Sequence, residues 1–248
     1  MRNSLLLLPG PLALLGSGEY TPAMHETDRL LLAALGVVCP RVALIPAASG
    51  LEPGMPAHWN QLGVAHFAAL GAEPLPLPLV GRADAEQPAI LEQLRSADLF
   101  YFSGGNPEYL VETLRDSPAW AVIAERRAAG AGVAGCSAGA MMMSGYTLRV
   151  RAVALGQPPR WISALGVAPE LVVLPHFDRM AAYVGDDVFG AIMRSAPAHV
   201  RLVGIDEDTA LIRLRPAGHW EVSGHQSVVL IAPDGTRHTY RAGEVVPL

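Results

Sequence analysis

The sequence has few cysteines and contains no long apolar run. Cys39 and Cys136 are its two cysteines, too few for a disulfide framework, and no Cys-x-x-Cys spacing suggests a zinc site. No apolar stretch approaches the ~20 residues that a membrane-spanning helix needs. The leucines at positions 5–8 resemble the core of a signal peptide, but the Pro-Gly-Pro run at 9–11 interrupts them. We therefore expect a soluble, cytoplasmic protein with no targeting segment, no metal and no membrane partner.

Charge is also sparse in this sequence. Only 17% of the 248 residues are charged, and 18 basic against 23 acidic residues give a net charge of −5. The basic residues are spread along the chain without a run that could follow a phosphate backbone, so we expect no nucleic-acid partner. The hydrophobic share of 51% is typical of a globular protein with a buried core.

Short apolar runs that end at Gly or Pro alternate with longer segments of helical period. This alternation is typical of an α/β fold, in which helices cover a parallel sheet. The expected strands are Leu12–Leu15, Arg41–Ile45, Pro74–Leu77, Leu99–Phe102, Gly132–Gly135 and Leu171–Leu174. The expected helices are Glu26–Leu35, Trp59–Leu70, Pro88–Leu94, Pro107–Leu114 and Ala119–Ala129. We predict a single domain over residues 1–248, with a three-layer, open, mostly parallel sheet flanked by helices.

The pattern changes after about residue 200, where short strands follow one another without long helices. These strands are expected at Leu202–Ile205, Ala210–Leu214, Gly218–Val222, Val228–Ile231 and His238–Arg241. Turns such as Pro233–Gly235 join them, which predicts antiparallel pairs at the C-terminal edge of the sheet.

The segment Gly135–Ala140 reads Gly-Cys-Ser-Ala-Gly-Ala and lies between a strand of small residues and an apolar helix start. This is the strand–turn–helix setting that a Gly-x-Ser-x-Gly nucleophile elbow needs, because a nucleophile in a strained turn requires small neighbours. The alternative is a tight turn in which Ser137 only caps the helix. The pattern indicates Ser137 as the nucleophile and Cys136 as a buried neighbour that points away from it.

Two further glycine turns follow expected strands. Ser103–Asn106 reads Ser-Gly-Gly-Asn and precedes Pro107, and Gly16–Glu19 follows the first strand. Glycines at a strand end allow backbone amides to face a ligand, as an oxyanion hole requires. The simpler alternative for the first turn is that Asn106 caps a helix whose first residue is Pro107. In an open α/β sheet, turns at the carboxyl ends of the strands form the site.

His176 is the histidine placed as a catalytic base, because it follows the apolar run Leu171–Leu174 at another strand end. The acid that would orient it stays open, since no Asp or Glu occurs between Ala138 and Pro169. Asp178 stands two residues beyond His176, so both side chains would project the same way if the backbone were extended. The other candidates are Glu170, the cluster Asp206–Glu207–Asp208, Glu19, or no acid at all.

These residues together resemble the cyanophycinase and aspartyl dipeptidase (peptidase E) family of serine peptidases, which has a class I glutamine amidotransferase-like fold. The matching pieces run from about Leu12 to about Ile231. They are Gly16–Glu19, Ser103–Gly105, Gly135–Ala140, His176–Phe177 with Arg179, and Gly204–Ala210. The resemblance implies Ser137 as nucleophile, His176 as base, and an oxyanion hole formed by amides near Gly105 and Ala138.

The sequence departs from this family at two places. Asn106–Pro107 stand where cyanophycinase-like members carry Asp-Gln, which removes the basis for predicting β-aspartyl or cyanophycin specificity. The acid that such members place between Ser and His is missing here. The amidotransferase arrangement, in which the acid lies two residues beyond the histidine, therefore favours Asp178.

We predict a serine peptidase that cleaves short peptides through an acyl-enzyme on Ser137, with His176 as general base and Asp178 as acid. The expected oxyanion and substrate-binding residues are Gly104, Gly105, Asn106, Ala138, Glu19 and Arg179. This chemistry needs no metal or organic cofactor, and the resemblance implies a homodimer. The alternatives are an esterase or acyltransferase with the same elbow, and an inactive binding or regulatory protein on the same fold.

Overall fold

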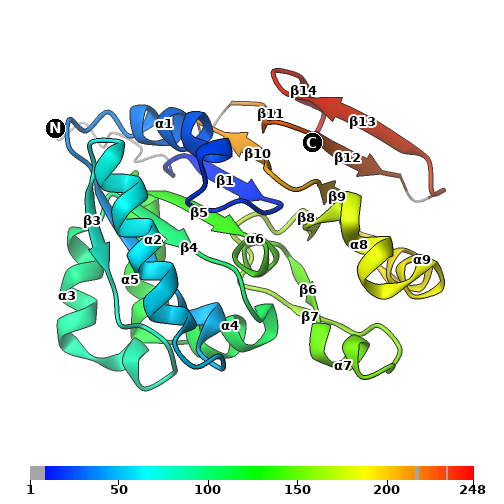
Figure 1. Cartoon of the computed structure of the whole chain (residues 1–248), viewed down its shortest axis with the longest axis horizontal. Helices are drawn as coiled ribbons and strands as arrows, with labels where there is room; N and C mark the ends of the chain where they lie inside the picture. The colour runs from blue at the N-terminus through cyan, green and yellow to red at the C-terminus, as the bar shows by residue number, and fades with distance from the viewer. Residues whose placement is uncertain (1–8, 216–217, 233) are drawn as a thin grey trace, which may run out of the picture.

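The computed structural model describes residues 9–215, 218–232 and 234–248. Within these residues, a central sheet of eight strands has the order β14-β11-β10-β1-β5-β4-β2-β3 (Figure 1). Its parallel part consists of β1 (Leu12–Leu15), β2 (Arg41–Ile45), β3 (Glu73–Pro76), β4 (Leu99–Phe102) and β5 (Gly132–Cys136). The antiparallel strands beyond β1 are β10 (Thr209–Arg213), β11 (Trp220–Gly224) and β14 (Val245–Val246).

Helices cover both faces of the central sheet. One face packs against α1 (His25–Ala34) and α2 (Met55–Ala69). The other packs against α3 (Pro88–Ser96), α4 (Pro107–Leu114), α5 (Pro118–Ala128) and α6 (Ala138–Met143). Alternation along the strands separates the two cores: Leu12 and Leu14 belong to one, Ala13 and Leu15 to the other. The predicted α/β fold, with a mostly parallel sheet flanked by helices, is confirmed.

A second sheet lies beside the central one and has the order β13-β12-β9-β8. Its strands are β8 (Leu171–Leu174), β9 (Arg201–Ile205), β12 (Ser227–Ile231) and β13 (Arg237–Arg241). The strand predicted at Leu171–Leu174 therefore exists, but it pairs in parallel with β9 and not with the central sheet. The predicted antiparallel C-terminal strands divide between the two sheets, a partition that local periodicity does not encode.

The chain between β5 and β9 contains elements that the sequence pattern did not predict. Between α6 and β8 these are β6 (Tyr146–Leu148), α7 (Val150–Ala154) and β7 (Trp161–Ser163), and β6 pairs with β7. Between β8 and β9 lie α8 (Phe177–Val184) and α9 (Asp186–Ser195). Short 3-10 turns occur at Pro22–Met24, Ala47–Ser49 and Asp84–Glu86. The helices α7, α8 and α9 and the second sheet share a third apolar cluster, to which Met141, Leu148 and Ile192 also belong.

Strand register brings the glycine turns together at one edge. In the parallel pairs, Leu15 lies opposite Cys136 and Phe102 lies opposite Gly135, so β1, β4 and β5 end side by side. In the second sheet, Leu174 lies opposite Gly204, so the turns after β8 and β9 also emerge together. None of the helices in the described ranges is long and apolar enough to cross a bilayer.

Candidate active site

The elbow at Ser137 is a strained turn between β5 and α6. Ser137 has φ 50° and ψ −109°, and its amide donates to the Leu15 carbonyl at 2.9 Å. A Cβ on Gly135 would lie 2.5 Å from the Gly139 carbonyl carbon, and one on Gly139 would lie 2.5 Å from the Phe102 carbonyl oxygen. Side chains larger than hydrogen at these two positions would push α6 off the sheet. The small residues therefore allow the tight turn that holds the Ser137 hydroxyl at the strand end.

A chain of hydrogen bonds links Ser137 to His176 and His176 to Glu207. The Oγ of Ser137 lies 3.0 Å from Nε2 of His176, and Nδ1 of His176 lies 2.9 Å from Oε1 of Glu207. His176 immediately precedes α8 and has left-handed backbone angles, φ 49° and ψ 38°, and its ring faces the elbow. The arrangement has the order nucleophile, base and orienting acid of a Ser–His–acid triad.

The structure corrects the position expected for Asp178. The helix α8 begins at Phe177, so the backbone between His176 and Asp178 is not extended as the prediction required, and the Asp178 carboxylate contacts groups other than the His176 ring. Its Oδ1 accepts a hydrogen bond from the Glu207 amide at 2.9 Å, and its Oδ2 lies 3.4 Å from Nε of Arg179. Asp178 therefore supports the acid that contacts His176, while Glu207 itself makes the contact.

The other candidate acids lie elsewhere. Asp206 accepts from the Ser227 amide at 3.2 Å, and burial, reinforced by the charge of Asp178, raises its pKa. The amide of Asp208 donates to Ser17 Oγ at 3.3 Å, and Glu170 lies 4.0 Å from Nη1 of Arg213. Each of these residues thus makes its contact with a residue other than His176.

Sequence reasoning named Glu207 within a cluster but did not select it. One signal is the matching position of the two residues: each stands two residues beyond a strand end, His176 after β8 and Glu207 after β9. This signal selects Glu207 only when β8 and β9 are known to pair in parallel. Tyr183 was also missed. Its exposed hydroxyl donates to Glu207 Oε1 at 3.1 Å, and this hydrogen bond raises the pKa of Tyr183.

The buried side chain of Glu19, in the first glycine turn, links the other two glycine turns by hydrogen bonds. Its Oε1 accepts from the Gly104 amide at 2.8 Å, and its Oε2 accepts from the Cys136 thiol at 2.8 Å. Burial, together with this carboxylate, raises the pKa of the Cys136 thiol well above its usual range. Cys136 is fully buried and its thiol points to Glu19, which agrees with its expected position away from the nucleophile.

We expect Glu19→Ala to weaken both stability and turnover. The substitution leaves the buried Gly104 amide without its acceptor, which should lower the free energy of unfolding by about 1–3 kcal/mol. Because the freed turn borders Ser137, kcat should fall more than KM rises. Urea unfolding and steady-state kinetics measure the two effects. Glu19→Gln keeps an acceptor for Gly104 and should lose less; equal behaviour of both variants would contradict this role of Glu19.

The residues predicted to form the oxyanion hole differ in whether their backbone amides are free to bind a substrate. The Gly104 amide is occupied by Glu19, whereas the amides of Gly105 and Ala138 donate to no other described residue. Gly105 has φ 139°, and an added Cβ would collide with the Ala48 carbonyl, so only glycine fits there. Both residues line the cavity that opens onto Ser137 and His176.

Asn106 and Arg179 do not line that cavity. Asn106 caps α4, because its Oδ1 accepts from the Tyr109 amide at 2.9 Å. Arg179 is 62% exposed and lies 3.9 Å from Oε2 of Glu207, beyond its 3.4 Å contact with Asp178. Across the ranges described, no three His, Cys, Asp or Glu side chains are grouped as a metal site would require.

Comparisons with a family profile and with individual relatives point to the same family of peptidases. A family profile described as Peptidase family S51 matches residues 12–215. A cyanophycinase from Trichormus variabilis is 27% identical over 234 residues, which cover 91% of this chain and 74% of the relative. A cyanophycinase from Synechococcus elongatus is 28% identical over 217 residues, covering 83% of this chain and 65% of the relative.

Solved structures agree with the sequence comparison. The crystal structure of a peptidase from an acI-B1 Actinobacterium superposes with a TM-score of 0.87 at 34% identity, covering 98% of both chains. A putative peptidase E protein from Listeria monocytogenes shares the fold, with a TM-score of 0.56 at 18% identity over 95% of this chain and 100% of the other. The predicted resemblance to the cyanophycinase and peptidase E family is confirmed. The chain belongs to peptidase family S51 and is a peptidase.

Proposed function

We propose that this peptidase cleaves short peptides through an acyl-enzyme on Ser137, with His176 as general base and Glu207 as the group that orients His176. The hydrogen-bond chain from Ser137 Oγ through His176 to Glu207 carries the proposal. Family membership supports peptide bonds as the substrate class.

His176 performs the proton transfers in this mechanism. Its Nε2, 3.0 Å from Ser137 Oγ, takes the hydroxyl proton as the oxygen attacks the scissile carbonyl. The same proton then goes to the leaving amine, which departs as the acyl-enzyme forms. Water, deprotonated by His176, attacks the ester and releases the acid product, while Ser137 recovers its proton.

Glu207 and two backbone amides stabilise the charges that develop. The Glu207 carboxylate accepts from Nδ1–H, which keeps Nε2 free to act as the base and stabilises the imidazolium. The free amides of Gly105 and Ala138 border the nucleophile and would donate to the oxyanion. A donor of this kind is worth about 3 kcal/mol of barrier.

Labelling with a fluorophosphonate tests the nucleophile directly. We expect intact mass to rise by one probe adduct, and peptide mapping to locate the adduct on Ser137. Labelling should suppress cleavage of a dipeptide mixture, followed by release of free amino groups. His176→Ala should label much more slowly, because the hydroxyl loses its base. Absence of an adduct on the folded protein, or an adduct on another serine, would overturn the proposal.

A further inference from the structure

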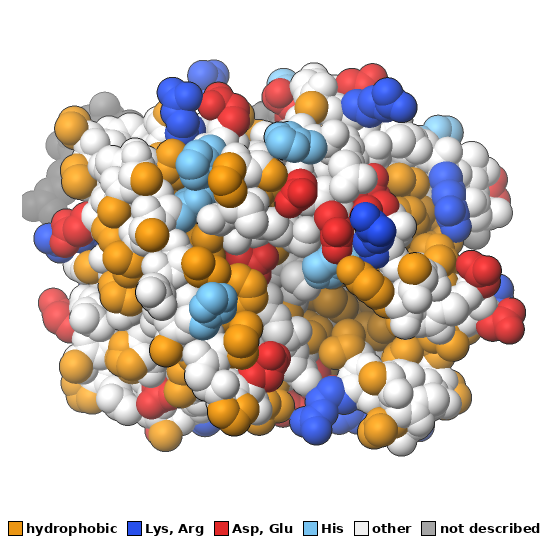
Figure 2. Space-filling model, viewed as in Figure 1, with side chains coloured by type: hydrophobic (Ala, Val, Ile, Leu, Met, Phe, Trp, Pro, Cys, Tyr) orange, Lys and Arg blue, Asp and Glu red, His pale blue; other side chains and the backbone are white. Residues whose placement is uncertain are grey.

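The cavity beside Ser137 has walls of apolar side chains. It has a volume of about 410 Å³, with Ser137, Ala138 and His176 on one side. The rest of the lining comes from α6, β6, α7, α8 and α9, and its side chains include Met141, Leu148, Val153, Met180, Val188 and Ile192. Figure 2 shows a hollow on this face of the molecule with hydrophobic side chains exposed along its walls.

The helices α8 and α9 contribute to the cavity from one face each. Met180 and Val184 are four residues apart on α8, and Val188 and Ile192 are four residues apart on α9. Residues at this spacing lie on the same side of a helix. Both helices therefore present an apolar stripe to the space beside the nucleophile.

No carboxylate or guanidinium is among the described side chains that line this cavity; its titratable groups are His176 and Tyr183. A charged substrate side chain would therefore lose its hydration without gaining a partner of opposite charge. An apolar side chain, by contrast, gains about fourfold in binding for each methylene that it buries.

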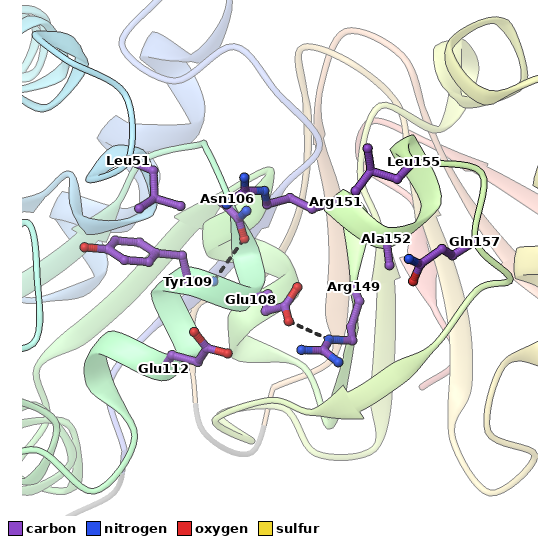
Figure 3. Close-up of a pocket in the computed structure, with 10 residues that line it drawn as sticks. All are labelled: Leu51, Asn106, Glu108, Tyr109, Glu112, Arg149, Arg151, Ala152, Leu155 and Gln157. Carbon is purple, nitrogen blue, oxygen red and sulfur yellow. Dashed lines mark hydrogen bonds and ion pairs between the residues drawn. The ribbon is translucent and has the colours of Figure 1, made fainter.

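A second cavity, with charged side chains in its lining, also borders α7 but does not contain the nucleophile. Arg149, Arg151, Glu108 and Glu112 line it, together with Asn106 (Figure 3). Arg149 is already paired there, with its Nε 2.5 Å from Oε1 of Glu108. Arg149 and Arg151 thus do not line the cavity beside Ser137, to which α7 contributes Val150 and Val153.

We propose that the substrate of this peptidase carries an apolar side chain directly beside the scissile bond, and that this side chain occupies the cavity of α6, β6, α7, α8 and α9. The inference rests on the proposed function and names its substrate class: short peptides with Leu, Met or Phe next to the cleaved bond. A volume of about 410 Å³ lies within the range of ligand pockets and accommodates such a side chain.

A dipeptide series tests this specificity. The series places Leu, Met, Phe, Asp, Glu or Arg on either side of the bond, with Gly or Ala as the other residue, and kcat/KM is measured by chromatography of the products. We expect the best apolar dipeptide to exceed every charged one by at least ~10-fold. A charged dipeptide cleaved as well as or better than the apolar ones overturns the inference. If that cleavage still requires Ser137, the proposed function stands; if no dipeptide is cleaved and Ser137 takes no label, both fail.

Two variants on α9 test the cavity itself. Val188→Asp places a carboxylate in the cavity, whereas Met193→Asp introduces the same carboxylate at a half-buried position that lines a different cavity. We expect Val188→Asp to lower kcat/KM for the Leu dipeptide by at least ~10-fold, mainly through KM, and Met193→Asp to lower it by less than ~3-fold. Fluorophosphonate labelling of both variants confirms a folded elbow. Equal losses in kcat/KM would mean that helix packing, and not the cavity, is responsible, and would overturn the assignment.

Discussion

Ser137→Ala is expected to lower peptide turnover by at least ~1000-fold, because it removes the hydroxyl that lies 3.0 Å from Nε2 of His176 and would form the acyl-enzyme. Residual cleavage would come from substrate binding and from the amides of Gly105 and Ala138. Alanine fits the strained elbow with one atom fewer, so the fold should survive. Steady-state kinetics on the preferred dipeptide measures the loss, and far-UV circular dichroism checks the fold.

Cys136→Ala is the matched control for this prediction. The thiol is adjacent in sequence but buried on the opposite side of β5, where it donates to Glu19. We expect Cys136→Ala to retain turnover within ~10-fold. Wild-type activity in Ser137→Ala, or a larger loss of turnover in Cys136→Ala, would show that Ser137 is not the nucleophile.

The second large effect is expected at Glu207. Glu207→Gln keeps the size of the side chain but removes the charge that stabilises the imidazolium, and its amide can present a donor to Nδ1 in place of an acceptor. Turnover should therefore fall by ~100-fold or more, with little change in KM. Measurement of kcat for this variant on the preferred dipeptide provides the test.

Asp178→Asn separates the acid from the residue that supports it. Asparagine keeps an oxygen that can accept from the Glu207 amide, a bond now made by Asp178 Oδ1 at 2.9 Å. We expect a loss of less than ~10-fold in kcat, clearly smaller than that of Glu207→Gln. A loss in Asp178→Asn that equals or exceeds the loss at Glu207 would restore Asp178 as the acid and contradict the role proposed from the geometry.

Much of the central sheet was predictable because its signals are local. Buried parallel strands are largely continuous apolar runs, and β1, β2 and β4 have the bounds that their runs predict. Gly or Pro flanks β1 and β2, whereas the polar Asp98 and Ser103 flank β4. Pro107 and the Asn106 cap likewise set the start of α4. The segment from β6 to α9 was less predictable, since its short elements are stabilised mainly by packing in the third apolar cluster.

The sequence by itself determined the α/β fold, the elbow and the positions of Ser137 and His176 at strand ends. Each of these depends on neighbours within a few residues: small side chains around a strained turn, or an apolar run before a polar residue. Only the tertiary structure decided which acid contacts His176. The parallel pairing of β8 with β9 brings Glu207 to the imidazole across 31 positions of sequence, while the start of α8 at Phe177 turns Asp178 away. Strand pairing between distant segments depends on the packing of the whole chain, and no local pattern specifies it.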